Sequence, residues 1–404
     1  MRKMALRAWV AALVFSGSAF SQSAPNDLFK RLDGNGDGKL SKEELPERAR
    51  QNFPRLDNDK DGFISEQEHE AFMRRMREKG RFGQRPGQGT APLPAGVRLE
   101  ADIPYAGTDN RRQRLDLMLP ETPKDGKLPV VVFIHGGGWQ SGDKVGGRHR
   151  VVDLVASGEF AGVSVGYRLT DEAQFPQQIY DCKAAIRWIR ANADKYKLDP
   201  DKIAVWGSSA GGHLVSLLGT SGDVKALEGD LGPNASVSSR VTCVVNFFGP
   251  SNFLPMGAQS GKGARLNHDS PDSPEAKLIG GALQENKEKA KAASPITYVG
   301  KDDPPFLNVH GDADPVVPYA QSTSLHAALK EAGVASTLIT IEGGGHGQGF
   351  PPGVNDIVVK FLRHQLKGEA GEFPDQAIKA VDVPPGNRRP ERRAPGAGRR
   401  PADA

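Results

Sequence analysis

The sequence predicts an α/β fold, a mostly parallel sheet flanked by helices, and a small all-α module ahead of it. Wholly apolar runs such as residues 130–134 recur along the larger part, and segments with helical spacing of apolar residues separate them. This alternation builds βαβ units, whose parallel strands are buried on both faces. Near the N-terminus, two acidic loops begin at Asp33 and Asp57, 24 residues apart, and predict the separate module.

The first 21 residues have the pattern of a secretory signal peptide. A basic start with Arg2, Lys3 and Arg7 precedes an apolar stretch at 8–15, and small residues near Ser21 suit cleavage. The apolar stretch is too short to span a bilayer, and the sequence has no other candidate. We therefore expect no transmembrane segment and a location in the periplasm or outside the cell.

The module at residues 24–76 contains two twelve-residue loops of the EF-hand type. Each loop offers oxygen ligands at the six positions that such loops use, and a glycine between them permits the sharp turn. The first set is Asp33, Asn35, Asp37, the Lys39 carbonyl, Ser41 and Glu44, and the second is Asp57, Asp59, Asp61, the Phe63 carbonyl, Ser65 and Glu68. These oxygens suit Ca²⁺, so the loops predict bound calcium. An acidic surface turn that binds no ion is the alternative.

The short distance between the loops leaves room for one helix of about 12 residues, which must serve both loops. This spacing resembles dockerin-like and other compact EF-hand pairs. Leu40 and Ile64, at matching positions of the two loops, are expected to pair. Only Met73 and Met76 lie nearby, whereas calcium sensors use methionine-rich faces, so we expect structural calcium.

Residues 77–96 are rich in Gly, Pro, Gln and Arg and show no periodicity, which predicts a flexible linker. Residues 97–367 are then expected to form one large domain with a single core. Its first two strands, near 97–105 and 113–119, alternate apolar and polar side chains. We expect them to form the antiparallel edge of the sheet.

A glycine-rich loop, HGGGW at 135–139, follows the apolar run at 130–134. Because its three glycines have no side chains, their backbone N–H groups can turn toward a developing negative charge. Gly137 and Gly138, with the N–H of Ala210, are therefore candidate oxyanion-hole donors. A tight turn without chemistry is the alternative. His135 precedes the candidate nucleophile described next and is expected to shape the loop rather than act as a base.

The segment GSSAG at 207–211 fits the pattern G-x-S-x-G and lies between an apolar strand at 203–206 and an apolar helix at 212–218. This context predicts a sharp strand-to-helix turn that lifts Ser209 above the sheet as a nucleophile.

Two later loops offer the partners that a nucleophilic serine needs. A strand at 305–309 leads into HGDADP, where Asp312 and Asp314 compete to orient a histidine. The context D-P-V-V-P favours Asp314 as the residue that orients the histidine, and Asp312 is expected to form a hydrogen bond within the turn.

A further strand at 337–341 leads into a glycine-rich loop that carries His346. The order Ser209, Asp314, His346 is the chain order of the α/β-hydrolase triad. Other histidines are expected to be structural or on helix surfaces: His213, His310, His326 and His364.

With these motifs, residues 98–367 resemble an α/β-hydrolase of the carbohydrate-esterase and carboxylesterase kind. The resemblance rests on HGGGW, YRL at 167–169, DCKAAIRWIRANA at 181–193, GSSAGGH, HGDADPVVP and GGGHG. This part of the chain is similar to the family that holds bifunctional acetyl-xylan and feruloyl esterases, and to hormone-sensitive-lipase-like esterases. The resemblance implies acyl-enzyme hydrolysis of acetyl or feruloyl esters, on plant or algal polysaccharide, without a catalytic cofactor. It does not fix the ester.

Two other classes of function remain open. A serine peptidase of the prolyl-oligopeptidase kind shares the triad, although no part of the sequence is long enough for its propeller domain. Alternatively, the calcium module docks to a scaffold and the hydrolase is its cargo. The segment 251–298 contains no long apolar lid, which disfavours a lipase, but it is placed to cover part of the site.

Four aromatic residues near the motifs either stack on a substrate or belong to the core: Trp139, Phe175, Phe248 and Phe350. The two cysteines leave a similar choice. Cys182 lies on the apolar face of a helix and Cys243 in a strand, so buried free thiols and a disulfide both remain open.

Residues 368–404 lose apolar content and are predicted to form a disordered Pro/Arg-rich tail. Such a tail is either merely solvated or makes electrostatic contact with an anionic polymer. The formal net charge of +4 is too small to indicate a nucleic-acid partner.

Overall fold

The structure is a computed structural model that describes residues 29, 32–33, 35–45, 53–69, 93–124 and 126–382. The signal peptide predicted at 1–21, most of the linker predicted at 77–96 and the end of the predicted tail lie outside these residues. The chain divides into two compact units, residues 1–90 and 91–404.

The first unit holds the two acidic loops. The strands β1 (Lys39–Leu40) and β2 (Ile64–Ser65) pair antiparallel, with Leu40 opposite Ile64. This pairing confirms the contact expected between the loops. The helical turn α4 (Phe53–Leu56) precedes the second loop. A small apolar core joins them and consists of Phe29, Leu40, Leu45, Phe53, Leu56 and Ile64.

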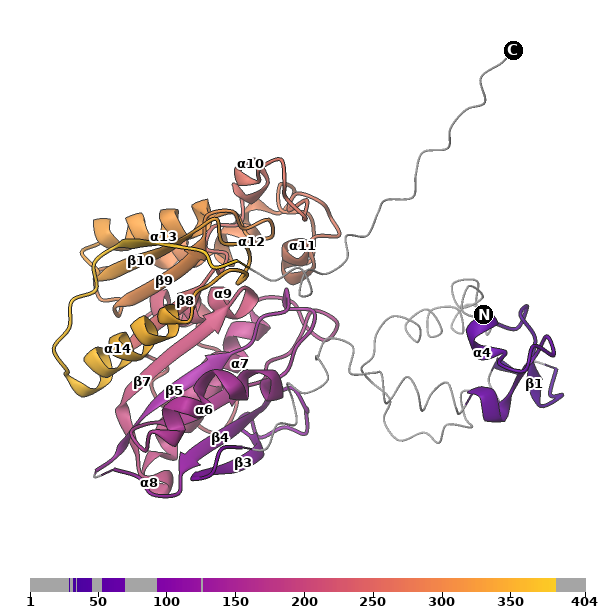
Figure 1. The fold of residues 1–404 in the computed structure, drawn as a ribbon, viewed down its shortest axis with the longest axis horizontal. Coiled ribbons are helices and arrows are strands. Elements are labelled where there is room, and N and C mark those ends of the chain that lie inside the picture. Colours follow the sequence, from indigo (N-terminus) through magenta and orange to yellow (C-terminus); the bar gives the residue numbers. More distant parts are fainter. Residues whose placement is uncertain are drawn as a thin grey trace, which may run out of the picture. The chain divides into compact units, whose positions relative to one another are not determined.

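The second unit is built on a nine-stranded sheet with the order β11-β10-β9-β8-β7-β5-β6-β4-β3 (Figure 1). The strands are β3 (Val97–Pro104), β4 (Arg114–Pro120), β5 (Leu128–Ile134), β6 (Ala161–Val165), β7 (Leu198–Ser208), β8 (Cys243–Phe247), β9 (Phe306–Gly311), β10 (Ser336–Glu342) and β11 (Gln376–Lys379). The strands β3, β4 and β6 pair antiparallel, and the pairs from β6 to β11 are parallel. The predicted parallel sheet with an antiparallel edge is confirmed.

Helices cover both faces of this sheet. The helices α6 and α14 pack on one face, and α7, α9 and α13 pack on the other. The longer helices are α6 (Arg148–Ala156), α7 (Gln177–Ala191), α9 (Ala210–Thr220), α13 (Ala320–Glu331) and α14 (Gly353–Lys367). The short helical segments are η1 (Lys144–Gly147), α8 (Ala193–Tyr196), η2 (Lys225–Leu227), α10 (Met256–Gln259), α11 (Pro274–Ile279), α12 (Lys287–Ala292) and η3 (Pro295–Tyr298).

The two cysteines are buried and free. Cys182 belongs to the core on the α7 face, and Cys243 belongs to the core on the α14 face. Because the sheet separates the two thiols, the structure settles the open choice against a disulfide.

The prediction of a disordered tail is wrong for residues 368–382. They contain β11, which pairs parallel with β10 and places Ile378 opposite Ile341. The side chains of β11 are mostly exposed. An edge strand of this kind is held by backbone hydrogen bonds, so its sequence carries no apolar signal.

Candidate active site

Ser209 lies in the turn between β7 and α9, with φ 55° and ψ −124°. Residues other than glycine rarely adopt these backbone angles, and strained turns of this kind cluster at functional sites. Two glycines make the turn possible. A Cβ on Gly207 would lie 2.3 Å from the Gly211 carbonyl oxygen, and one on Gly211 would lie 2.1 Å from the Ile134 carbonyl oxygen. The turn therefore holds Ser209 at the carboxyl edge of the sheet.

The glycine-rich loop 135–139 packs directly against this turn. A Cβ on Gly136 would lie 2.7 Å from the Ser208 carbonyl oxygen and 3.3 Å from the Ser209 Cβ. Only a glycine permits so close an approach of two backbone segments.

The next two glycines have positive φ, 115° for Gly137 and 60° for Gly138. Within the described residues, their N–H groups have no protein acceptor, and neither does the N–H of Ala210, the first residue of α9. Beside Gly138 lies Pro274 of α11, whose Cβ is 3.4 Å from the position that a Cβ on Gly138 would take. The three N–H groups are free to bind a ligand next to Ser209.

Asp314 and His346 are joined by a hydrogen bond of 2.6 Å between Oδ2 and Nδ1. The Asp314 carboxylate is buried, and the His346 ring is partly exposed. Because an ionised carboxylate only accepts, Nδ1 carries the proton in neutral His346 and leaves Nε2 as the basic nitrogen. Burial raises the pKa of Asp314, but hydrogen bonds from His310 and His346 outweigh it and hold that pKa well below its usual range.

His310, expected to be structural, makes the second of these bonds. Its Nε2 lies 3.2 Å from Asp314 Oδ2 and 3.1 Å from the Val317 carbonyl oxygen, and its Nδ1 lies 2.8 Å from Ser322 Oγ. Both neighbours of Nε2 are acceptors, so Nε2 carries the proton and Ser322 donates to Nδ1. His310 therefore orients the carboxylate that His346 bonds.

Asp312, the competing carboxylate, is exposed and accepts the Gly343 N–H at 2.7 Å. Among the residues that the structure describes, it bonds no histidine. Asp312 thus bonds the turn, and Asp314 is the carboxylate that meets His346.

Phe248 packs on His346, with 4.5 Å between the ring centroids. Its φ is 42°, which is rare for an aromatic residue. The preceding residue, Phe247, accepts the Ser209 N–H at 2.9 Å. One tight turn after β8 therefore contacts both the serine turn and the histidine. Nothing in the sequence signals this contact, because a strained φ at a phenylalanine leaves no compositional trace.

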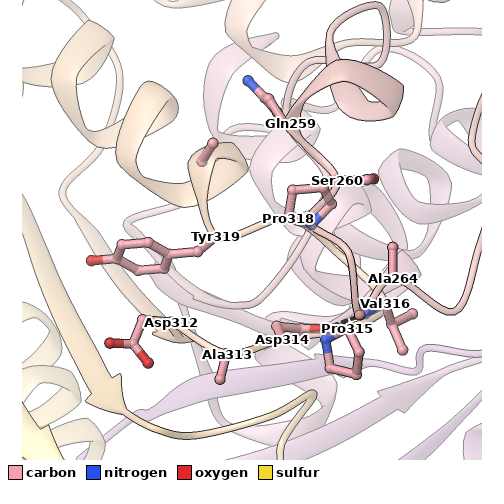
Figure 2. A pocket seen from close by; sticks show the side chains of 13 residues that line it. Gln259, Ser260, Ala264, Asp312, Ala313, Asp314, Pro315, Val316, Pro318 and Tyr319 are labelled. Atoms are coloured by element: carbon pink, nitrogen blue, oxygen red, sulfur yellow. Dashed lines mark hydrogen bonds between the residues drawn. The ribbon is translucent and has the colours of Figure 1, made fainter.

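A pocket of about 440 Å³ lies along the loop that carries Asp314 (Figure 2). One wall comes from residues 259–264, which belong to the segment expected to cover part of the site. The other wall runs from Asp312 to Ala320 and includes Tyr319, whose hydroxyl lies 2.5 Å from Thr340 Oγ1. Figure 2 shows the Asp312 carboxylate and the Tyr319 hydroxyl on the same side of this pocket.

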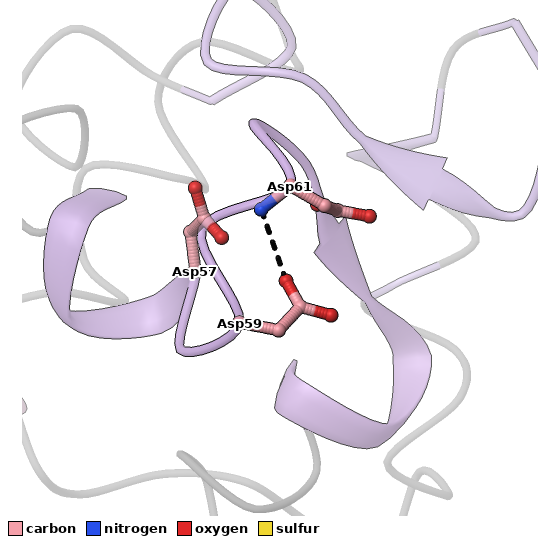
Figure 3. A group of neighbouring side chains, drawn as sticks. All are labelled: Asp57, Asp59 and Asp61. Carbon is pink, nitrogen blue, oxygen red and sulfur yellow. Dashed lines mark hydrogen bonds between the residues drawn. The ribbon is translucent and has the colours of Figure 1, made fainter.

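In the first unit, the second loop gathers acidic oxygens. One carboxylate oxygen from each of Asp57, Asp59 and Asp61 lies within 4.8 Å of the others (Figure 3). Glu68 turns back over the loop, and its carboxylate accepts the N–H groups of Asn58, Asp59 and Ser65. An all-oxygen set of this kind fits Ca²⁺.

The first loop has a similar pattern of hydrogen bonds from its backbone to its acidic side chains. Asp33 accepts the N–H groups of Gly36 and Gly38 at 2.7 and 2.9 Å, and Glu44 accepts that of Ser41 at 2.8 Å. In both loops, the first aspartate and the last glutamate therefore turn toward the loop backbone, as the EF-hand spacing requires.

The fold and the serine turn place the larger unit in the α/β-hydrolase class. The BD-FAE family model matches residues 115–329, more than half of the chain, and the chain belongs to this family of α/β-hydrolase esterase domains. The EF hand family model matches residues 26–47.

Similar curated proteins carry esterase names. Esterase LipQ of Mycobacterium tuberculosis is 31% identical over 237 residues, which cover 58% of this chain and 54% of LipQ. Esterase LipC of the same organism is 31% identical over 275 residues, covering 67% of this chain and 66% of LipC. The chain thus spans between about half and two thirds of the length of these relatives.

Two solved structures are also similar. A truncated form of a carbohydrate esterase from gut microbiota has a TM-score of 0.64 at 34% identity, covering 69% of this chain and 100% of that chain. A bifunctional GH43-CE protein of Bacteroides eggerthii has a TM-score of 0.61 at 38% identity, covering 66% of this chain and 35% of that chain. Across the described part of the chain, no helix is both long and apolar enough to cross a membrane.

Proposed function

We propose that this chain is a serine esterase that hydrolyses small acyl esters through a Ser209–His346–Asp314 triad. The observation that carries the proposal is the 2.6 Å bond between Asp314 and His346. It fixes the histidine tautomer whose Nε2 can accept a proton, at the same edge of the sheet as the strained Ser209 turn.

In the first step, Ser209 Oγ attacks the ester carbonyl carbon while His346 Nε2 takes its proton. The imidazolium that forms is stabilised by the buried Asp314 carboxylate and stays in contact with the Phe248 ring. When the tetrahedral intermediate collapses, His346 returns the proton to the leaving alcohol. A water molecule then repeats the sequence on the acyl-enzyme and releases the acid.

The oxyanion of the tetrahedral intermediate accepts hydrogen bonds from the free N–H groups of Gly137, Gly138 and Ala210. A single donor of this kind contributes roughly 3–4 kcal/mol to transition-state stabilisation in comparable hydrolases. Ala210 also stands at the N-terminus of α9, where the helix dipole favours negative charge.

For the substrate, we propose an acetyl or feruloyl ester carried by a polysaccharide. The structural neighbour at 34% identity is a carbohydrate esterase by name, which supports a sugar-linked alcohol.

The test compares the wild-type protein with Ser209→Ala on p-nitrophenyl acetate, acetylated xylan and methyl ferulate. Ser238→Ala, an exposed serine outside the site, is the matched control. Release of acetate or ferulate that is lost only in Ser209→Ala supports the polysaccharide esterase. Turnover of p-nitrophenyl acetate alone supports a general carboxylesterase. No Ser209-dependent turnover on any of the three contradicts the proposal and favours the peptidase or docking alternatives.

For the N-terminal unit, we propose that both loops bind Ca²⁺ and that the ion has a structural role. The oxygen donor sets around Asp33 and Asp57 support this proposal. Ligand binding that neutralises clustered carboxylates would stabilise the small core shared by the loops.

We further propose export of the protein, supported by the signal-peptide pattern of residues 1–21. N-terminal sequencing of protein recovered from the periplasm or culture medium should show cleavage near residue 21. We also propose that the module contacts a scaffold or that the basic tail contacts an anionic polymer. A partner that binds residues 24–76, or the arginine-rich residues 384–404, would support this contact.

A further inference from the structure

The C-terminal strand β11 leads into residues that bond the loop carrying His346. The Ala380 N–H donates to the Glu342 carbonyl oxygen at 2.9 Å, and the Val381 N–H donates to the Gly349 carbonyl oxygen at 2.9 Å. Glu342 is the last residue of β10, and Gly349 lies beyond His346 in the same loop. Two successive amides of one segment therefore bond both ends of the histidine loop.

This loop needs anchoring from outside. Five of the seven residues at 343–349 are glycines, and three of them, Gly343, Gly347 and Gly349, have φ of 73°, 74° and 78°. Glycine loses more backbone freedom than any other residue when it is ordered. The loop's own backbone supplies few hydrogen bonds, namely Gly344 N–H to Ile341 and Gly345 N–H to Gln348. Asp314 holds the His346 ring, and Asp312 and the Ala313 N–H bond the first half of the loop, at Gly343 and Gly344. The second half, beyond His346, depends on contacts from elsewhere.

The hydrogen bonds of this segment to the loop come from its backbone, and its side chains add only marginal packing. The side chain of Val381 is 46% exposed, and most of β11 is exposed. Ile378 and Ala380, together with Phe350, pack at the margin of the core on the α14 face. A Cβ on Gly349 would lie 3.0 Å from the Ala380 Cβ, so the loop and this segment are in close contact.

We propose that residues 376–381 form a positioning strap that holds His346 in place for catalysis. The proposal rests on the esterase function proposed above. A strap of this kind acts on the proton-transfer step, because that step requires His346 to be aligned with Ser209 and Asp314. Its loss lowers kcat and leaves substrate binding nearly unchanged.

The sharpest test removes one hydrogen bond. Val381→Pro in the full chain deletes the N–H that bonds Gly349, and Asp382→Pro, one residue further on, is the matched control. We expect Val381→Pro to lower kcat about two- to tenfold with little change in KM, as for one lost hydrogen bond. A chain that ends at Asp375 loses the whole strap but keeps the bonds of Phe373 and Asp375 to β10. It should lose at least about tenfold in kcat relative to a chain that ends at Asp382.

Amide hydrogen exchange at residues 343–349 gives a readout that is independent of activity. Exchange there should be faster in Val381→Pro than in Asp382→Pro, while exchange in the central strands stays the same. Equal exchange and equal kcat in the two proline variants overturn the strap. If the wild-type protein shows no Ser209-dependent turnover, the proposed function fails instead, and hydrogen exchange alone decides whether the strap holds the loop.

Discussion

The indole N–H of Trp139 donates a hydrogen bond of 3.2 Å to Nδ1 of His213. The same imidazole donates from Nε2 to the Ala293 carbonyl oxygen, 2.7 Å away. One buried, neutral ring thus joins the glycine-rich loop, helix α9 and the segment that follows α12. Trp139 itself has φ 55° and is 1% exposed, so it belongs to the core and fixes the loop that carries the proposed oxyanion donors.

Burial lowers the pKa of His213 to about 4, whereas a histidine in the unfolded chain has a pKa of about 6.5. Between these values the unfolded chain binds the proton and the folded chain does not. The free energy of unfolding therefore falls as the pH drops from about 6.5 to about 4, by up to roughly 3 kcal/mol from this residue. Above about pH 6.5 both states are neutral, and this contribution to stability is fully present.

His213→Gln should remove this pH dependence. A glutamine can accept from Trp139 and donate to Ala293, but it does not titrate. Urea unfolding at about pH 7.5 and about pH 4.5 should show a smaller loss of stability in the variant than in the wild-type protein. An equal loss in both proteins would mean that His213 is not the group that titrates.

Asp314→Asn should lower kcat by about 10³- to 10⁴-fold on p-nitrophenyl acetate, because an amide no longer fixes the His346 tautomer or stabilises the imidazolium. Asp312→Asn is the matched control, since its amide oxygen can still accept the Gly343 N–H. It should keep kcat within about threefold of the wild-type value. The reverse ranking of the two variants would show that the acid has been assigned to the wrong carboxylate.

Much of this architecture could be predicted because its signals are local. The buried strand β5 is a continuous apolar segment of the sequence, and the glycines around Ser209 indicate a turn in which only glycine fits at those positions. The EF-hand loops place each ligand at a fixed spacing, and the opposition of Leu40 and Ile64 follows from that spacing. In each case the physical requirement falls on residues that are close together in the sequence.

The remaining features depend on contacts between distant segments. The strand β11 has exposed side chains and a composition typical of a tail, so only its pairing with β10 reveals it. The packing of Phe248 on His346 joins residues almost one hundred positions apart, and the bond from His310 to Asp314 depends on how one loop closes. Periodicity and motif spacing carry no information on such contacts.

Glu68→Gln should weaken calcium binding to the N-terminal unit by about tenfold or more, because Glu68 is the carboxylate at the last ligand position of the second loop and turns back over it. Isothermal titration of the full chain with Ca²⁺ measures the effect, and Glu66→Gln, which is not at a ligand position, is the control. EDTA should leave turnover of a soluble ester unchanged, since the triad lies in the other unit. Equal affinities in the two variants would show that Glu68 is not a ligand, and no measurable Ca²⁺ binding by the wild-type protein would contradict the calcium proposal itself.

Gly211→Ala should destabilise the domain by about 2–4 kcal/mol, because the new Cβ would lie 2.1 Å from the Ile134 carbonyl oxygen. The new Cβ on α9 would meet a backbone atom of β5, which cannot rotate away as a side chain can. Relief of the clash would therefore require α9 or β5 to move, and this would shift the Ser209 turn. Gly353→Ala at the start of α14 meets no atom within 4 Å and should be neutral or stabilising by up to about 1 kcal/mol. Urea unfolding of both variants measures the contrast, and a Gly211→Ala protein with the wild-type midpoint and activity would refute the tight packing of the serine turn against β5.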